Sequence, residues 1–384
     1  MYEETPGITH LLEHILCRRL DDLNQSELYK ELDKYGLCFN GAIYSKTLCF
    51  EVSGNIKFFR QACDVLVKLL APPCFTDEDL KAERKRICRE IEEDDKPNTI
   101  DYLINKCVWK DTALGRYASS SAVKKISLAK LKAEKEKIFT SENMFFYATG
   151  AVSEEDIGYL GGLIEKYNIP FGTPRNIVTP VTANFLRRGP DVCVKKPSYY
   201  NSVAFSIEYD AEKYTQQEID LLYAILFFGN SAALYLSLSE ERGLIYGIDD
   251  YRERYANAGV IYFSYEIEFE DLHESIKASA EVLYNVKTEI SDFDFNRAVT
   301  YYTENVWEDD VDTVNGDMSF DNHCLNYGYK DLDEYKKLFL NVSKERLQTV
   351  ANEILRSENI CVAVRAQKKV DADLIKKIIS DTLI

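Results

Sequence analysis

The sequence lacks a long apolar run, an excess of basic residues, and closely spaced cysteine pairs. Its longest apolar stretch, residues 221–228, is far shorter than the ~20 residues that cross a bilayer. Lys and Arg number 47 against 64 Asp and Glu, so the net charge is −17, which repels phosphate backbones and anionic lipid headgroups. The acidic residues 1–4 have no apolar signal region behind them. We therefore expect a cytoplasmic protein whose main partner is neither nucleic acid nor a membrane.

The ten cysteines are scattered singly, without a Cys-x-x-Cys pair. They are Cys17, Cys38, Cys49, Cys63, Cys74, Cys88, Cys107, Cys193, Cys324 and Cys361. Several lie inside apolar runs, as Cys49 does between Leu48 and Phe50. This placement favours buried free thiols in a reducing compartment over disulfides or a thiolate zinc site.

A segment rich in proline and glycine divides the chain into two halves. Residues 169–190 contain four prolines and two glycines without helical or strand periodicity, which predicts an interdomain linker. The 384 residues are enough for two hydrophobic cores. We therefore expect an N-terminal domain over residues 1–168 and a C-terminal domain over 191–384.

Each half mixes strand and helix patterns. Alternation of apolar residues predicts strands within 48–52, 145–152, 203–207 and 261–269. Helical periodicity predicts helices within 56–71, 76–94, 215–228 and 273–289. The predicted fold class is therefore α+β, with two domains of similar construction.

Histidine is scarce, and two of the four histidines flank a glutamate. His10, Glu13 and His14 form a His-x-x-Glu-His pattern, which arises by chance in a chain like this with a probability of roughly a few in a thousand. On a helix these three side chains fall within an arc of roughly 100°, and the aliphatic residues of the segment cluster on the opposite side. Two imidazoles one turn apart can bind one cation, and neutral imidazole is a preferred zinc ligand. The alternative is an exposed polar face with two incidental histidines.

A catalytic zinc usually has three protein ligands and one open position. The helix that opens at Thr76, with Asp79 three residues on, is the best place to find the third ligand. Glu83 and Glu90 lie beside the buried stripe of this helix, and inward-facing carboxylates require a cation or strong donors. Without the histidine motif, the interpretation of both glutamates as solvated surface charges would be equally well supported.

These motifs resemble the inverzincin signature of the insulinase/pitrilysin metallopeptidases. His10-Leu11-Leu12-Glu13-His14 is followed after 76 residues by Glu90, and Pro6-Gly7 precede the motif as the family's small lead-in residues do. Residues 75–95 match the family's helix with the third ligand, and residues 234–247 match a substrate-contacting helix and turn. The similarity is greatest to the two-domain branch, which includes mitochondrial processing peptidase subunits and their bacterial relatives.

The resemblance implies a zinc-dependent metalloendopeptidase that hydrolyses peptides or unfolded segments inside a closed chamber. One Zn²⁺ per chain would be bound by His10, His14 and Glu90. Glu13 would act as the general base, and Glu83 would orient a ligand histidine. The implied fold is a pair of similar α/β sandwiches, each with a mainly antiparallel sheet packed against helices.

The resemblance also implies substrate-contacting residues and a partner. Asn40, Gly41 and Ala42 match a segment that lines the substrate cleft, and Arg242 and Tyr246 belong to the matching part of the second domain. Active relatives carry an arginine seven residues before the tyrosine, where this chain has Ser239. This favours a homodimer or a heterodimer with a related subunit that supplies the missing arginine.

Two other functions and the identity of the metal remain open at this point. The chain could be a non-catalytic or structural subunit of a heteromeric complex, or a plain metal-binding module, and Mn, Co or Fe suits the same ligand types. The family places a strand-rich segment before its motif, whereas nine residues precede His10. We therefore expect the first domain to lack the family's first strands.

Overall fold

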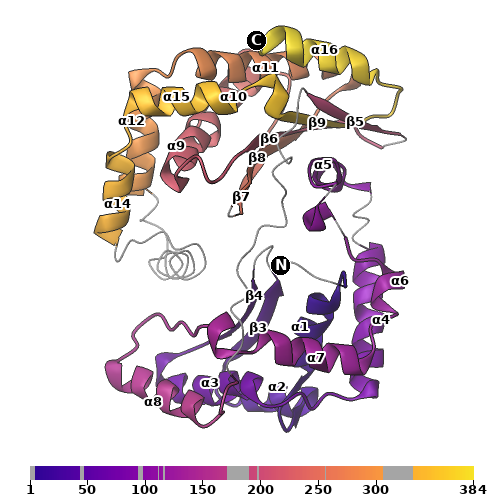
Figure 1. Ribbon diagram of the computed structural model, residues 1–384, viewed down its shortest axis with the longest axis vertical. Helices are drawn as coiled ribbons and strands as arrows, with labels where there is room; N and C mark the ends of the chain where they lie inside the picture. Colours follow the sequence, from indigo (N-terminus) through magenta and orange to yellow (C-terminus); the bar gives the residue numbers. More distant parts are fainter. Residues whose placement is uncertain are drawn as a thin grey trace. The chain divides into compact units, whose positions relative to one another are not determined.

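The structure is a computed structural model in which two compact units are formed from interleaved stretches of chain (Figure 1). The first unit comprises residues 1–95 and 116–177, and the second comprises 96–115 and 178–384. The residues described are 5–43, 47–93, 98–110, 112–115, 117–170, 190–196, 199–255, 257–305 and 332–384. Most of the predicted linker, together with Cys324, lies outside these ranges.

The second unit is built on a five-stranded sheet, whose strand order is β5-β9-β6-β8-β7. The strands are β5 (Asp191–Lys195), β6 (Ser202–Tyr209), β7 (Asp249–Arg254), β8 (Gly259–Glu266) and β9 (Ile360–Arg365). All neighbouring pairs are antiparallel except β5 and β9. The predicted strands 203–207 and 261–269 are confirmed, although β8 ends before Ile267.

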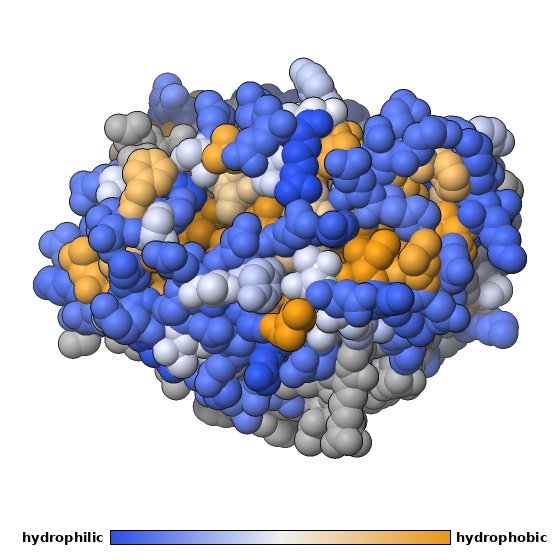
Figure 2. All heavy atoms as spheres, turned by 90° about the horizontal axis from the view of Figure 1, so that it is seen from above, coloured by the Kyte–Doolittle hydropathy of each residue, from blue (hydrophilic) through white to orange (hydrophobic). Residues whose placement is uncertain are grey.

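Helices cover both faces of this sheet (Figure 1). On one side are α9 (Gln216–Phe227), α10 (Ala233–Tyr235), α11 (Leu272–Thr288), α12 (Asp292–Thr300), α14 (Leu332–Leu340), α15 (Lys344–Ile354) and α16 (Ala372–Thr382). The face shown in Figure 2 is mostly hydrophilic, with apolar residues in scattered groups. The apolar sides of the helices therefore point inward.

The opposite face of the sheet is covered by α5 (Ile100–Val108), which sequence reasoning placed in the first domain. Ile104 and Trp109 pack there against Tyr262 and Cys361. As a result β6 is buried along its whole length, although its alternating pattern predicted a half-buried strand. The alternating pattern shows only that the large apolar side chains of one face of the strand are buried. It cannot show that a helix covers the small residues of the other face.

Cys107 on α5 and Cys193 on β5 form a disulfide. The prediction of free thiols is therefore wrong for this pair, because residues separated by 86 positions become neighbours only when α5 packs on the sheet. The prediction that the thiols are buried is also wrong for Cys38, Cys49 and Cys74, which are exposed free thiols. Cys49 lies among apolar neighbours in sequence, but successive residues of a strand point to opposite faces.

The first unit is centred on α1 (Ile8–Arg18), which packs against α4 (Asp77–Glu93), β3 (Cys38–Ile43) and α7 (Leu128–Ile138). Its other elements are β1 (Arg19–Leu20), β2 (Leu23–Asn24), α2 (Gln25–Asp33), β4 (Leu48–Ser53), α3 (Phe59–Leu66), α6 (Ser120–Val123) and α8 (Glu154–Glu165). β3 and β4 form an antiparallel pair in which Gly41 faces Phe50. The predicted helices and the strand at 48–52 are confirmed.

The strand predicted within residues 145–152 is wrong, since the structure has no strand there. Phe145 and Phe146 are half-buried and lie outside any sheet ladder. Alternation gives a strand only where a neighbouring strand supplies backbone hydrogen bonds. Among the described residues, no helix is both long and apolar enough to cross a membrane.

Candidate metal centre

The first turn of α1 depends on a glycine. Gly7 adopts a left-handed conformation with φ of 88°, which L side chains disfavour. A Cβ atom at Gly7 would lie 2.9 Å from Cγ2 of Val123 and 3.0 Å from Cβ of Ala118. Gly7 thus lets the chain turn into the helix while staying in close contact with residues 118–123.

The two faces of α1 then separate apolar from polar groups. Its apolar face is fully buried, and it comprises Ile8, Leu11, Leu12, Ile15 and Leu16. The histidine side of the helix faces α4, where Glu83 contacts His14. Thr76 caps α4, because its hydroxyl accepts from the Asp79 amide and the Asp79 carboxylate accepts from the Thr76 amide. Asp79 also accepts from Arg19 at 2.6 Å, which ties α4 to the end of α1.

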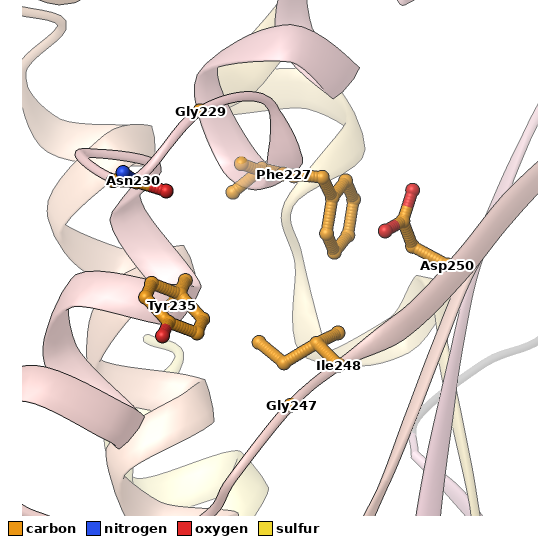
Figure 3. Close-up of a pocket in the computed structure, with 8 residues that line it drawn as sticks. Phe227, Gly229, Asn230, Tyr235, Gly247, Ile248 and Asp250 are labelled. Carbon is orange, nitrogen blue, oxygen red and sulfur yellow. The ribbon is translucent and has the colours of Figure 1, made fainter.

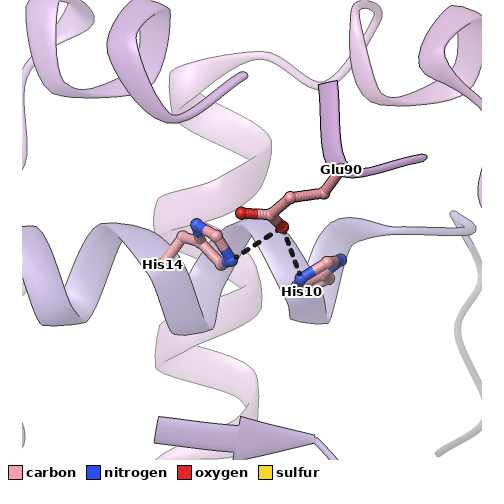
Figure 4. A group of neighbouring side chains, drawn as sticks. All are labelled: His10, His14 and Glu90. Atoms are coloured by element: carbon pink, nitrogen blue, oxygen red, sulfur yellow. Dashed lines mark ion pairs between the residues drawn. The ribbon is translucent and has the colours of Figure 1, made fainter. Parts of the chain in front are cut away.

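The packing of α1 on α4 brings His10, His14 and Glu90 together (Figure 4). Oε2 of Glu90 lies 3.6 Å from Nε2 of His10 and 3.4 Å from Nε2 of His14. Two ligand atoms of a tetrahedral zinc, each ~2.1 Å from the metal, are ~3.4 Å apart. These two spacings match those of zinc ligands, and all three donor atoms lie within 4.8 Å of one another; in the described part of the chain they form the one group of three such residues that could bind a metal.

His14 is oriented by a carboxylate behind it. Glu83, with a side chain only 1% exposed, lies 3.2 Å from Nδ1 of His14 through Oε2. Its other oxygen accepts from Arg18 at 3.1 Å. Burial raises the pKa of Glu83, but the hydrogen bond with His14, the charge of Arg86 and the hydrogen bond from Arg18 outweigh it and lower the pKa overall. An ionised Glu83 can only accept, so Nδ1 of His14 carries the proton and the lone pair of Nε2 points toward Glu90.

Glu13 lies beside this group rather than within it. Its Oε2 is 3.6 Å from Nε2 of His14. Burial raises the pKa of Glu13, and the nearby His14 offsets this only in part. A raised carboxyl pKa moves this group toward the range in which it can both accept and return a proton near neutral pH.

β3 runs past Glu13, and one of the predicted cleft residues on this strand, Gly41, lies against it. A Cβ atom at Gly41 would lie 2.6 Å from Oε1 of Glu13, so Gly41 is in direct contact with the general-base candidate. Ala42 is half-buried next to it, and Asn40 is exposed. Of the three predicted cleft residues, the structure therefore brings Gly41 into contact with the histidine motif.

Comparison with sequence families matches both units. Residues 1–119 match the family described as insulinase (peptidase family M16), and residues 125–302 match the peptidase M16 inactive domain. The chain belongs to the M16 family. This membership agrees with the mixed, antiparallel-rich fold described above.

The M16 relatives are distant in sequence and close in fold. An uncharacterized zinc protease of Rickettsia felis is 23% identical over 304 residues, which cover 75% of this chain and 68% of that protein. The β subunit of mitochondrial-processing peptidase from Saccharomyces cerevisiae is 25% identical over 44% of this chain and 39% of its own length. A crystal structure of a peptidase M16 inactive domain from Pseudomonas fluorescens has a TM-score of 0.82 at 14% identity, covering 96% of this chain and 90% of that one.

The second M16 unit contains the remaining predicted residues. Ser239 lies in a π-helical turn, Leu236–Glu241, and is half-buried. Arg242 follows this turn and forms an ion pair with Glu281 at 2.8 Å, whereas Tyr246 is 99% exposed. Tyr246 is thus free to contact a ligand, and Arg242 would first have to leave Glu281.

The same unit contains a pocket of about 310 Å³ (Figure 3). It is lined by Leu226, Phe227, Gly229, Asn230, Tyr235, Gly247, Ile248 and Asp250. Sequence patterns do not reveal this pocket, because its walls come from the end of α9, from α10 and from the start of β7. Nor do they single out Arg18, although it follows His14 by one helical turn.

Proposed function

We propose that this M16 protein is a zinc metalloendopeptidase that hydrolyses peptides or unfolded polypeptide segments. The observation that carries the proposal is the convergence of His10, His14 and Glu90 with Glu13 alongside. A plain metal-binding module would have no use for Glu13, which lies next to the donor atoms without joining them. The zinc-protease names of the distant relatives support the same reaction class.

The roles of the residues follow from their positions. His10, His14 and Glu90 would hold the zinc, which when bound supplies Lewis acidity that polarises a scissile carbonyl and acidifies water. Glu13 accepts the proton of the attacking water through Oε2 and returns it to the leaving amine. Glu83 holds the proton of His14 on Nδ1 and so keeps Nε2 available.

Substitution of Glu13 by Gln tests this assignment. The ligands persist in Glu13→Gln, so zinc content should stay at one per chain while cleavage of a mixed peptide library falls by about 10²–10⁴-fold. Glu90→Ala should instead lose zinc, because only the two histidines remain. A Glu13→Gln protein that cleaves at the parent rate would remove Glu13 from the mechanism.

A partner chain is the second part of the proposal. With Ser239 in place of an arginine, one short hydroxyl replaces a rigid fork of donors that could fix a peptide carbonyl. We expect a related subunit to supply this group, in a homodimer or heterodimer. The names of two relatives, a mitochondrial-processing peptidase β subunit and a complex III structure, refer to multisubunit assemblies.

Ser239→Arg tests the partner directly. The isolated parent should bind zinc but cleave slowly, and the substitution should raise its peptidase activity. Ser237→Arg is the matched control, since it adds the same charge to the same π-helical turn. Full activity in the isolated parent, unchanged by Ser239→Arg, would contradict the partner proposal.

A non-catalytic subunit is the competing function. It is favoured by the loss of the expected arginine and by the match of residues 125–302 to an inactive domain. Zinc at one per chain with no cleavage, alone or with any related subunit, would support that reading.

A further inference from the structure

The carboxylate of Glu13 has two different surroundings. Its Oε2 lies 3.6 Å from Nε2 of His14, on the side of the metal-binding group. Its Oε1 lies 3.7 Å from Sγ of Cys17, a hydrogen bond in which the thiol donates. Cys17 follows Glu13 by one turn of α1, so both side chains project from the same side of the helix.

β3 closes the space around this contact. A Cβ atom at Gly41 would be 2.6 Å from Oε1 and 2.9 Å from Cγ of Glu13, and 3.1 Å from Sγ of Cys17. The backbone of Gly41 therefore lies directly against both side chains. Any larger residue at this position would have to displace one of them.

The thiol is suited to donating and not to reacting. Burial, together with the charge and hydrogen bond of the neighbouring Glu13, raises the pKa of Cys17 to about 12. Cys17 thus keeps its proton at neutral pH, and an ionised Glu13 can only accept. Cys17 is also half-buried, whereas Cys38, Cys49 and Cys74 of the same unit are exposed.

We propose that Cys17 is a positioning residue for the general base: it holds Oε1 of Glu13 against Gly41 and so directs Oε2 toward the cation site. The inference rests on the proposed peptidase function, in which Glu13 moves the proton. Cys17 itself touches neither metal nor substrate. Without the thiol, Glu13 loses the donor on one oxygen and can turn away from the attacking water.

Three variants separate hydrogen bonding from packing. Cys17→Ala removes the donor, Cys17→Ser restores one, and Cys63→Ala removes another buried thiol of the same unit, away from the site. We expect Cys17→Ala to lower kcat about three- to tenfold with KM and zinc content unchanged. Cys17→Ser should keep kcat within about twofold of the parent, and Cys63→Ala should leave it unaltered. Equal kcat in Cys17→Ala and parent, or equally slow Cys17→Ala and Cys17→Ser, would overturn the inference.

A spectroscopic measurement tests the contact without zinc or substrate. The S–H stretching band of Cys17, identified in the metal-free protein as the band lost in Cys17→Ala, should move to higher frequency in Glu13→Ala as its acceptor disappears. A band that does not move would overturn the inference even in an active peptidase. If the parent protein shows no zinc-dependent cleavage, the proposed function fails, and the band shift still decides whether Cys17 holds Glu13.

Discussion

At the scale of single residues, the site is a chain of charges that fixes one imidazole. Arg18 bridges Asp79 and Glu83, with distances of 3.3 and 3.1 Å, and Glu83 in turn contacts His14. Because Glu83 is fully buried, its ionised form depends on these donors. Outward from the candidate metal site, the imidazole of His14 is therefore followed by the carboxylate of Glu83 and then by the guanidinium of Arg18.

Glu83→Gln should weaken zinc binding by about 10–100-fold, because the amide no longer attracts the proton of His14 to Nδ1. Competition with a zinc chelator measures the affinity. The matched control is Glu78→Gln, which removes the same charge from an exposed position on the same helix and should leave affinity unchanged. Equal affinities in both variants would contradict the role of Glu83.

The contact between His14 and Glu83 also predicts that the stability of the metal-free protein depends on pH. Burial lowers the pKa of His14, but the hydrogen bond with Glu83 and the charge of Glu13 outweigh it and raise the pKa above its ordinary 6.5. The pKa of Glu83 is lowered from its ordinary 4.5. His14, whose pKa is raised, stabilises the fold below about pH 6.5 and loses this effect as the pH rises. Glu83, whose pKa is lowered, stabilises the fold above about pH 4.5 and loses this effect as the pH falls.

Urea unfolding of the metal-free parent and of Glu83→Gln should therefore differ most near pH 5.5. The difference in free energy of unfolding should shrink toward alkaline pH, as His14 releases its proton. A difference that stays constant across this range would show that the two groups are not coupled.

At the scale of elements, the start of α1 decides whether the histidines meet α4. Gly7→Ala combines an unfavourable φ with contact at 2.9 Å to Val123, so we expect it to destabilise the first unit by about 1–3 kcal/mol. The control is Gly36→Ala, which has φ of +63° but no atom within 4 Å of the added Cβ. It should cost only the backbone strain, about 1–2 kcal/mol, and should not disturb zinc binding. Denaturant melts and zinc titration measure both effects.

At the scale of the whole molecule, the disulfide Cys107–Cys193 closes a loop of 86 residues that includes much of the first unit. Both of its ends belong to the second unit, so it fixes α5 on the sheet. Replacing both cysteines by Ala should lower the stability of the second unit by about 2–5 kcal/mol. Reductant should then destabilise the parent but not the double variant. If reductant affects both equally, the disulfide is not the cause.

The sequence alone indicated which residues of the first unit could bind a metal. The spacing of His10, Glu13 and His14 places them on one helical face, and this depends only on the 3.6-residue period of the helix. The pattern of α4 likewise placed Glu83 and Glu90 beside its buried stripe, and of the two Glu83 is buried in the structure. Local periodicity is short-ranged, so it can be read without knowing which elements pack together.

Only the tertiary structure decided the features that depend on distant segments meeting. The membership of α5 in the second unit, the disulfide between Cys107 and Cys193, and the absence of a strand at 145–152 all depend on which surface each segment finds. The contact of Gly41 with Glu13 and Cys17 is of the same kind, since β3 reaches α1 through packing. Such contacts are chosen by shape and burial in the folded chain, and amphipathic patterns record only that some face is buried, not against what.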